Sequence, residues 1–504
     1  MTMDFEKLEL GGDRGLFTDE QHRQLRLSAA HCPIRGREPG WHEECGVVGL
    51  WAPGESVASL SYLALFSLQH RGQESAGIAI TDGMHLDLEK GMGLMREAFA
   101  DRAPVLNGHA AIGHVRYSTF GSSSFANIQP ILASFSGGLV CLAHNGSLTN
   151  SQSIQKRLQD EGHIFQTSTD TEAILNLIVS SQASSLEERI IDSLRQIEGA
   201  YCLTVMAGDK LIGARDPHGF RPLCLGRTPG GGHIIASESC ALDAVKAEFI
   251  RDIEPGEMVI IDQDGVRSRR IFSEPKNLSH CVFEYIYFAR PDSVIDGQSV
   301  WQARYRMGRQ LAREFTGQAD LVAPVPDTGV TAALGFAAES GLPYMEALIK
   351  NRYVGRTFIL PDQASRKATV EMKLNPIRAN IKDKRVVLVD DSIVRGTTSA
   401  SLISLIRRAG AKEVHFMISS PPITDPCYYG IDTAIRKDLI AAVKSVEEIR
   451  RFLGADSLHY LSSAGLMASV GDPGEKRMCT ACFSGRYPTD VSEVENVNNK
   501  QDES

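Results

Sequence analysis

The sequence lacks the features of several large protein classes. It contains no run of about 18 consecutive apolar residues, so no transmembrane helix is expected. It also lacks a basic excess: 53 Lys and Arg residues stand against 62 Asp and Glu residues, and the net charge of −9 argues against a general nucleic-acid or membrane-surface binder. Only ten of the 504 residues are cysteines, too few for a disulfide-stabilised scaffold, so we expect reduced thiols.

The first 44 residues also lack the signals of exported or imported proteins. They hold no apolar stretch of about 7–15 residues, which argues against a secretory signal, and their nine acidic residues are atypical of a transit peptide. We therefore expect a cytoplasmic protein. Residues 1–44 are rich in charge and glycine and show little periodicity, so they are either a flexible N-terminus or a propeptide. Residues 488–504 are polar and are predicted to form a disordered tail.

The length of the chain predicts about three domains, or two large ones. From Cys45 to about residue 280 the pattern is one of short apolar runs, typical of strands, with a few helices. We expect a helix over Ser56–Gln69 and a helix start at Thr169–Glu172, which has the S/T-x-x-E form. Gly230–Gly232 is predicted to be a hairpin turn, because a strand follows it. Strands are expected at 45–51, 75–80, 110–115, 138–143, 200–206, 211–214 and 233–236.

After about residue 281 the pattern changes to strands that alternate with helices. Apolar strands are expected at 321–325, 385–389 and 414–419, and helices over 330–341 and 400–410. Such alternation favours a mostly parallel sheet, in which ligands bind at the loops that follow the carboxyl ends of the strands. One helical face is expected to contain Trp301, Tyr305, Gly308, Ala312 and Phe315.

The loop DDSIVRGTTS, residues 390–399, is the most specific signal in the chain. Asp390 and Asp391 end an apolar strand, where adjacent carboxylates suit sugar hydroxyls or a Mg²⁺ ion. Arg395–Ser399 opens a helix whose free N–H groups and hydroxyls suit a phosphate, and Gly396 allows close approach of the backbone. The string is not a Walker P-loop, because the pattern G-x-x-x-x-G-K-S/T is missing. It resembles the phosphoribosyl pyrophosphate (PRPP) signature of type I phosphoribosyltransferases.

This resemblance implies PRPP-binding residues in three segments. Asp327, Thr328 and Gly329 match the segment that holds the pyrophosphate, although many relatives have a hydroxyl residue in place of Gly329. Residues 350–358 resemble a mobile loop that closes on PRPP, which implies roles for Lys350 and Arg356. Residues 350–385 contain ten Lys or Arg and three Asp or Glu, which fits a cationic lid over a polyanion, or a solvated basic face. The signature itself implies PRPP contacts for Asp390, Asp391, Arg395, Gly396, Thr397, Thr398 and Ser399, with Mg²⁺ on the two aspartates.

A second group of motifs begins at Cys45. A lone cysteine in an apolar run is usually a small buried side chain. Here, however, it is followed in order by HRGQESAG (70–77), GHVRY (113–117), HNG (144–146) and TDTE (169–172). Together these motifs resemble the glutaminase domain of class II amidotransferases, which has the N-terminal nucleophile fold, an αββα sandwich. The cysteine of that family must be residue one, because its own α-amino group is the base for the thiol. The resemblance therefore implies that residues 1–44 are a propeptide, removed before Cys45.

The same resemblance implies a role for each site residue. Cys45 attacks the glutamine carboxamide, and the Asn145 side-chain amide and Gly146 N–H form the oxyanion hole. For the glutamine-binding residues, Arg116 clamps the α-carboxylate and Asp170 holds the α-ammonium group. Arg71 orders the loop of the nucleophile. Taken singly, Asn145-Gly146 could equally be a hairpin turn, Asp170 a helix cap and Arg116 a surface charge.

The two resemblances meet in one family, the glutamine PRPP amidotransferases, over about residues 45–487. They imply a glutaminase domain at 45–280 and a phosphoribosyltransferase domain with a cluster-binding C-terminal segment at 281–487, a two-domain α+β and α/β fold. The family converts glutamine, PRPP and water into 5-phosphoribosylamine, glutamate and pyrophosphate, the first committed step of purine synthesis. The resemblance also implies feedback by purine nucleotides and a homotetramer, and we expect neither a nucleic-acid nor a membrane partner.

Four of the cysteines suggest a metal cofactor. The CxxC pair Cys479 and Cys482 alone could be a coincidence or half of a zinc site, but no second CxxC or His pair lies nearby. Cys281, Cys427, Cys479 and Cys482 match the ligands of a [4Fe–4S] cluster in one branch of the family, which also has a propeptide.

Two other functions stay open. One is a different transferase with a class II glutaminase, against which the DDSIVRGTTS string argues. The other is a ligand-sensing regulator without catalysis, against which the intact Cys45 motifs argue.

Overall fold

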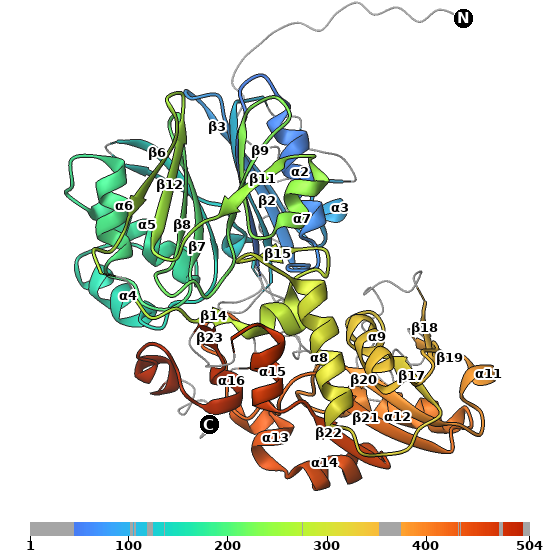
Figure 1. Ribbon diagram of the computed structural model, residues 1–504. Helices are drawn as coiled ribbons and strands as arrows, with labels where there is room; N and C mark the ends of the chain where they lie inside the picture. Colours follow the sequence, from blue (N-terminus) through green and yellow to red (C-terminus); the bar gives the residue numbers. More distant parts are fainter. Residues whose placement is uncertain are drawn as a thin grey trace, which may run out of the picture. The chain divides into compact units, whose positions relative to one another are not determined.

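The computed structural model describes residues 45–100, 104, 107–117, 124–135, 137–274, 276–351, 374–431, 433, 435–472 and 477–496 (Figure 1). All of them fall within one unit, residues 41–504. The expected propeptide and Arg356 lie outside the described residues.

Residues 46–270 form two antiparallel sheets. The first has the order β11-β9-β10-β1-β4-β2-β3 and the second the order β13-β12-β8-β7-β6-β5. The strands of the first sheet are β1 (Gly46–Trp51), β2 (Ser75–Thr81), β3 (Leu86–Met92), β4 (Ala110–Arg116), β9 (Cys224–Arg227), β10 (His233–Ala236) and β11 (Glu248–Asp252). Those of the second are β5 (Ile131–Phe135), β6 (Gly138–Asn145), β7 (Cys202–Ala207), β8 (Lys210–Arg215), β12 (Glu257–Asp262) and β13 (Gly265–Arg270).

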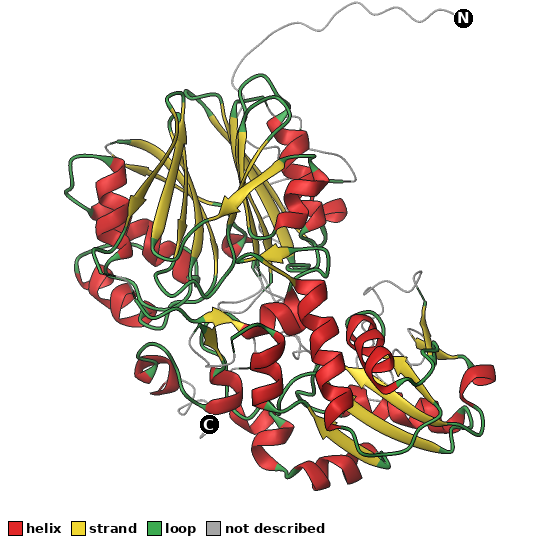
Figure 2. Cartoon of the chain, viewed as in Figure 1, coloured by secondary structure: helices red, strands yellow, loops and turns green. Residues whose placement is uncertain are grey.

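The two sheets pack face to face and are covered by helices on their outer faces (Figure 2). Successive residues of β1 show why both faces of a strand are apolar: Val47 belongs to the core between the sheets, and Val48 to the core under the outer helices. The helices over the first sheet are α2 (Val57–Ser67), α3 (Met95–Ala98) and α7 (Ser239–Ala244). Those over the second are α4 (Ser151–Asp160), α5 (Asp170–Ser180) and α6 (Leu186–Leu194). These layers confirm the expected αββα sandwich.

A connector of short elements follows the sandwich. It consists of β14 (His280–Cys281), a π-helix (Glu284–Phe288), β15 (Val294–Ile295) and β16 (Gln298–Ser299). β14 pairs in parallel with β23 (Met478–Cys479), which places Cys281 opposite Cys479. The remaining short elements are η1 (Phe125–Asn127), β18 (Leu348–Lys350), β19 (Leu374–Pro376), α11 (Arg378–Ile381), η3 (Arg436–Asp438), α13 (Ile440–Val443) and α16 (Ala481–Ser484).

The second half is built on a parallel sheet of four strands, in the order β17-β20-β21-β22. The strands are β17 (Leu321–Pro324), β20 (Arg385–Asp390), β21 (Glu413–Ile418) and β22 (Ser457–Tyr460). One face packs against α8 (Val300–Glu314), α9 (Gly329–Ser340) and α15 (Ser463–Ser469), and the other against α12 (Thr397–Arg408) and α14 (Val446–Leu453). This sheet confirms the mostly parallel sheet that was expected in the second half (Figure 1).

Helices α8 and α9 touch through two glycines. A Cβ atom on Gly308 would lie 1.8 Å from the carbonyl oxygen of Ala332, and one on Gly335 would lie 2.0 Å from that of Tyr305. Trp301 and Tyr305 lie on the same face of α8, as predicted, and their rings stack with centroids 5.0 Å apart. The face that enters the core is centred elsewhere, on Ala303, Met307 and Leu311.

The C-terminal segment differs from its prediction. Residues 488–496, assigned from the sequence to a disordered tail, are packed against the rest of the chain. Val491 is buried, and the Tyr429 hydroxyl bonds to Thr489 at 3.0 Å. One oxygen of Glu493 accepts hydrogen bonds from the N–H groups of Gln152 and Ser153, at 2.7 and 3.0 Å, and so caps the start of α4.

Most of the predicted elements are confirmed. A hairpin joins β9 and β10 at Gly230–Gly232, and α5 begins at Asp170 after the cap residue Thr169. The Glu172 carboxylate accepts from the N–H groups of Gln166 and Thr167, not from that of Thr169. Among the described residues, no helix is long and apolar enough to cross a membrane.

Candidate functional site

Five of the predicted glutamine-site residues lie at one end of the sandwich: Cys45, Arg116, Asn145, Gly146 and Asp170. In the first sheet, β1 begins just after Cys45, and Gly46 pairs with Val115, one residue before Arg116 ends β4. In the second sheet, β6 ends at Asn145. A hydrogen bond of 3.0 Å from His114 Nε2 to the carbonyl oxygen of His144 joins the two sheets at this end. The strands therefore bring together side chains from motifs about 100 residues apart.

The Cys45 thiol lies at the start of β1, 9% exposed, and its Sγ atom is 3.5 Å from the carbonyl oxygen of Tyr117. Nearby, burial lowers the pKa of His114 to about 3, so this imidazole is neutral near pH 7. A neutral His114 acts here as a buried link between the sheets.

Asn145, which ends β6, and the next residue, Gly146, are the predicted donors of the oxyanion hole. The side-chain nitrogen of Asn145 is buried and makes no hydrogen bond within the described structure. Leaving a buried donor without a partner is costly, so such a group usually has a functional reason. Gly146 has φ +139°, and a Cβ atom there would lie 2.2 Å from the carbonyl oxygen of Ala200, so only glycine fits.

Two charged side chains stand beside these donors. Arg116 is buried and pairs with Glu74 through its Nη1 atom. The Asp170 carboxylate accepts from the Leu148 N–H at 3.0 Å and lies 3.4 Å from His144 Nδ1. Burial acts to raise the pKa of Asp170, but His144 and the backbone N–H groups outweigh it, so the pKa is lowered and the carboxylate is charged. The site thus contains a cation, Arg116, and an anion, Asp170, which suit the two charges of a zwitterion.

Arg71, predicted to serve the glutamine site, points its guanidinium group elsewhere. Its Nε atom donates to Glu238, and its Nη2 atom donates to Glu284 at 2.5 Å. All three side chains are buried. The guanidinium group of Arg71 is thus held by two buried carboxylates, and its role in ordering the loop of the nucleophile stays a prediction.

The DDSIVRGTTS loop has the predicted form. Asp390 ends β20, Gly396 adopts φ +77° at the start of α12, and Thr397 opens that helix. Burial raises the pKa of Asp390, and the nearby Asp391 carboxylate raises it further. Burial also raises the pKa of Asp391, although hydrogen bonds from Ser392 and Thr328 oppose the shift. Two carboxylates side by side, Asp391 buried and Asp390 half-buried, favour a cation between or beside them.

Within the rest of the loop, Thr397 and Thr398 are exposed, Ser399 is buried, and Arg395 pairs with Asp438 at 2.8 Å. The first N–H groups of α12 point away from the helix, as at any helix start, and suit a phosphate.

The predicted pyrophosphate segment faces this loop. The Thr328 hydroxyl donates to Asp391, and Lys350 Nζ lies 2.6 Å from the exposed Asp327 carboxylate. A Cβ atom on Gly329 would lie 2.4 Å from the carbonyl oxygen of Val389, so α9 starts in direct contact with β20. This contact leaves no room for a side chain at Gly329.

The four cysteines of the predicted cluster converge. Cys281 lies opposite Cys479, and the carbonyl oxygen of Cys482 accepts from Thr424 and Asp425, just before Cys427. Burial raises the pKa of the Cys482 thiol, and the nearness of the other three sulfurs raises it further. Cys479 and Cys482 are free thiols. Within the described ranges, no group of three or more His, Cys, Asp or Glu side chains that could hold a metal ion is found.

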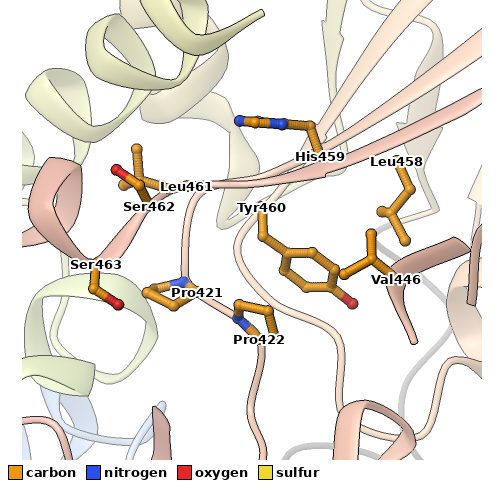
Figure 3. Close-up of a pocket in the computed structure, with 9 residues that line it drawn as sticks. All are labelled: Pro421, Pro422, Val446, Leu458, His459, Tyr460, Leu461, Ser462 and Ser463. Atoms are coloured by element: carbon orange, nitrogen blue, oxygen red, sulfur yellow. The ribbon is translucent and has the colours of Figure 1, made fainter. Parts of the chain in front are cut away.

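The pocket in Figure 3 lies elsewhere on the second half, beside β22. Its volume is about 270 Å³, and it is lined by Pro421, Pro422, Val446 and residues 458–463, none of them a predicted site residue. The lining is mostly apolar.

Sequence reasoning missed Glu238 and Glu284, the partners of Arg71. Glu284 is the single charge within the run VFEYIYF, and a charge inside an apolar run signals a buried partner. Glu238 gives no comparable signal.

Two family models match the chain. Residues 114–244 match a glutamine amidotransferase domain, and residues 294–431 match a phosphoribosyl transferase domain. The first range contains the ends of β4 and β6, and the second contains β17 and the DDSIVRGTTS loop.

Known relatives align along most of the chain. An amidophosphoribosyltransferase of Archaeoglobus fulgidus is 52% identical over 454 residues, 89% of this chain and 98% of that protein. One of Bacillus subtilis is 49% identical over 90% of this chain and 95% of its own length. A solved structure of the B. subtilis glutamine PRPP amidotransferase, in complex with ADP and GMP, has a TM-score of 0.84 at 48% identity, and covers 89% of this chain and 98% of its own. By this similarity over nearly its whole length, the chain belongs to the amidophosphoribosyltransferase family.

Proposed function

We propose that the chain transfers the amide nitrogen of glutamine to PRPP. The products are 5-phosphoribosylamine, glutamate and pyrophosphate, in the first step of purine synthesis. The best support is that one chain contains both sites. Cys45 and the unpartnered donor of Asn145 lie in the first half, and the acidic pair and Gly396 lie in the second. A glutaminase and a phosphoribosyl site in one chain suit a reaction that uses both substrates.

In the glutaminase half, the Cys45 thiolate attacks the carboxamide carbon of glutamine and forms a γ-glutamyl thioester with release of ammonia. Water then attacks the thioester and releases glutamate. The Asn145 amide and the Gly146 N–H stabilise the oxyanion of each tetrahedral intermediate. Arg116 and Asp170 hold the α-carboxylate and α-ammonium groups, respectively, which fixes the carboxamide against the thiol.

In the second half, ammonia attacks the anomeric carbon of PRPP as pyrophosphate leaves. The N–H groups and hydroxyls at Thr397, Thr398 and Ser399 bind the 5-phosphate, and Asp390 and Asp391 bind the ribose hydroxyls. Asp327, Thr328, Gly329 and Lys350 face the pyrophosphate. Arg395 and the predicted lid residue Arg356 would add positive charge. Ammonia passes between the sites inside the protein, since in water near pH 7 it would protonate and lose its nucleophilicity.

Mg²⁺ is the proposed cation at Asp390 and Asp391. Burial raises the pKa of both carboxyl groups, and the Asp391 charge raises that of Asp390 further, so a divalent cation beside the pair would stabilise their ionised forms. When bound, it would supply positive charge to the leaving pyrophosphate.

The base for Cys45 is proposed to be its own α-amino group. An α-amine titrates at about 7.7–8.0, close to cellular pH, so it can accept and return a proton. This requires cleavage between Glu44 and Cys45. Intact-mass measurement and N-terminal sequencing of the mature protein test the cleavage, and full glutaminase activity with residues 1–44 attached would contradict it.

A [4Fe–4S] cluster on Cys281, Cys427, Cys479 and Cys482 is the proposed second cofactor. Four cysteines whose sulfurs lie near one another fit its ligand set, and as thiolates they would hold the four irons. Its role would be structural, since it would tie the connector to the C-terminal segment. Anaerobic purification should give about four irons per chain, and Cys427→Ser should lower the iron content. Protein without iron would contradict the assignment.

Regulation and assembly follow the family. The B. subtilis relative was solved with ADP and GMP, and we propose that purine nucleotides inhibit this enzyme too. We also propose a homotetramer, which light scattering after size-exclusion chromatography would test. Six cysteines of the described residues, Cys141, Cys202, Cys224, Cys240, Cys479 and Cys482, are free thiols, which suits a reducing compartment such as the cytoplasm.

The central test is Cys45→Ala. The variant should lose all glutamine-dependent formation of phosphoribosylamine but keep synthesis from PRPP and ammonium salts, because the second site is intact. Loss of both activities, or glutamine use by the variant, would contradict the proposed division of labour. Glutamate release without any use of PRPP by the parent enzyme would indicate a different class II amidotransferase.

A further inference from the structure

Five charged side chains form a buried network at the connector: Arg71, Arg221, Glu238, Glu284 and Arg304. None is more than 3% exposed. Placing charges in a protein interior costs free energy that ion pairs seldom repay in full, and apolar residues of similar volume often serve stability as well. A network of this size therefore calls for a role beyond stability.

Glu284 and Arg71 are the centre of this network. The guanidinium group of Arg71 is shared between two carboxylates: Nε donates to Glu238 Oε1, while Nη1 and Nη2 donate to Glu284 Oε1 and Oε2 at 3.3 and 2.5 Å. Glu238 also accepts from Ser293 at 2.5 Å and from the Arg290 N–H at 2.9 Å. The bidentate contact with Glu284 fixes the plane of the guanidinium group and hence the chain at Arg71.

The loop that begins at Arg71 leads directly to the glutamine site. A Cβ atom on Gly72 would lie 2.5 Å from the carbonyl carbon of Val115, so this loop is pressed against the end of β4. Glu74 binds Arg116, the next residue of β4, at two points. Its N–H donates to the Arg116 carbonyl oxygen at 3.0 Å, and its carboxylate pairs with the Arg116 side chain. The residue after Arg116 is Tyr117, whose carbonyl oxygen contacts the Cys45 thiol.

In the other direction, Glu284 leads to the PRPP site. It is the first residue of the π-helix, a type of turn that is rare and frequent at functional sites. Arg304 of α8 binds three carbonyl oxygens of this turn and the residue after it, those of Tyr285, Tyr287 and Ala289, at 2.8–2.9 Å. Helix α8 continues toward the PRPP site: Gly308 lies against the Ala332 carbonyl of α9, and Gly329 at the start of α9 lies against the Val389 carbonyl, one residue before Asp390.

We propose that Glu284 is a positioning residue that couples the two sites: it holds Arg71, and through the loop 71–74 the glutamine-binding geometry, in a position that depends on the state of the PRPP site. The inference rests on the proposed function and deepens it. Glu284 is suited to this role because it bonds to the glutamine-site loop on one side and belongs to the Arg304-bound turn on the other. On the glutamine side, Glu284 reaches Arg116 through direct contacts, first with Arg71 and then through the loop 71–74.

The test is the variant Glu284→Gln, which keeps the size of the side chain but removes its charge. The matched control is Glu257→Gln, because Glu257 is equally buried and makes a bidentate pair with Arg251, at 2.6 and 2.8 Å, within the sandwich. For each enzyme we would measure the kcat and KM for glutamine with and without PRPP, and synthesis from ammonium salts. We would first show that the parent enzyme makes phosphoribosylamine from PRPP and ammonia. A failure of the proposed function would appear in that assay, apart from any result with Glu284→Gln.

For Glu284→Gln we expect a more than tenfold rise in the KM for glutamine and a similar loss of the stimulation of glutamate release by PRPP. Ammonia-dependent synthesis should stay within about twofold of the parent, and Glu257→Gln should leave the glutamine KM and the stimulation unchanged. Unchanged glutamine kinetics, or a parallel fall of glutamine and ammonia activities, would overturn the proposal. If Glu284→Gln does not fold, Glu284→Asp is used instead; it retains the charge with a shorter side chain and should show the same selective defect. Glutamine kinetics like those of the parent in Glu284→Asp would then overturn the proposal.

Discussion

Removal of the Asn145 amide gives the sharpest test of the glutamine site. The side-chain nitrogen is buried and has no hydrogen-bond partner in the described structure, so Asn145→Ala removes no existing bond of that nitrogen. One oxyanion donor contributes about 2.7–4 kcal/mol to the transition state, and each 1.36 kcal/mol is tenfold in rate. The glutamine-dependent kcat should therefore fall by about 10²–10³, while the stability of the fold changes little.

The assay is glutamate release at saturating PRPP, with ammonia-dependent synthesis measured in parallel. Asn176→Ala is the matched control, since the side-chain nitrogen of Asn176 on α5 is also buried without a partner but belongs to no predicted site. The control should keep its kcat for glutamine. A fall of less than about threefold in Asn145→Ala, or an equal fall with ammonia, would refute the assignment of the oxyanion hole.

Two further predictions concern the stability of the fold. Gly335→Ala should lower the free energy of unfolding by about 1–3 kcal/mol or more in chemical denaturation, because its Cβ would meet the Tyr305 carbonyl oxygen at 2.0 Å; unchanged stability would show that α8 and α9 can separate freely. Burial acts to raise the pKa of Glu238, but Arg71 and His70 outweigh it and hold the pKa below its usual value of 4.5. A lowered carboxyl pKa adds stability that is present above about pH 4.5 and is lost as the pH falls toward the folded-state pKa. The difference in unfolding free energy between the parent and Glu238→Gln should therefore be largest above pH 4.5 and shrink below it, and a difference that does not vary with pH would contradict the charge assignment.

The PRPP loop could be predicted from the sequence because its determinants are local. A strand, two aspartates, a glycine at a positive φ and a helix start follow one another within about fifteen residues, and each follows from residue type. The start of α5 at Asp170 was predictable for the same reason. The contacts of Glu172 were not, because three backbone N–H groups compete within one turn and the local chain path decides among them.

The partners of Arg71 could not be predicted, because they are set by tertiary structure. Glu238 and Glu284 lie 167 and 213 residues away along the chain, and no periodicity or spacing connects them to the HRGQES motif. Likewise, the face of α8 that enters the core depends on how closely Gly308 lets α9 approach, and helical spacing alone indicates only which residues share a face.

The cap on α4 has a consequence for biosynthesis. Ser153 leaves the ribosome 340 residues before Glu493, the side chain that accepts its N–H. At about 5–20 residues per second, the ribosome needs roughly 17–70 seconds to produce the missing acceptor. During that interval α4 lacks this cap, so the helix that follows β6 in the first half of the chain can reach its final form only when translation is nearly complete.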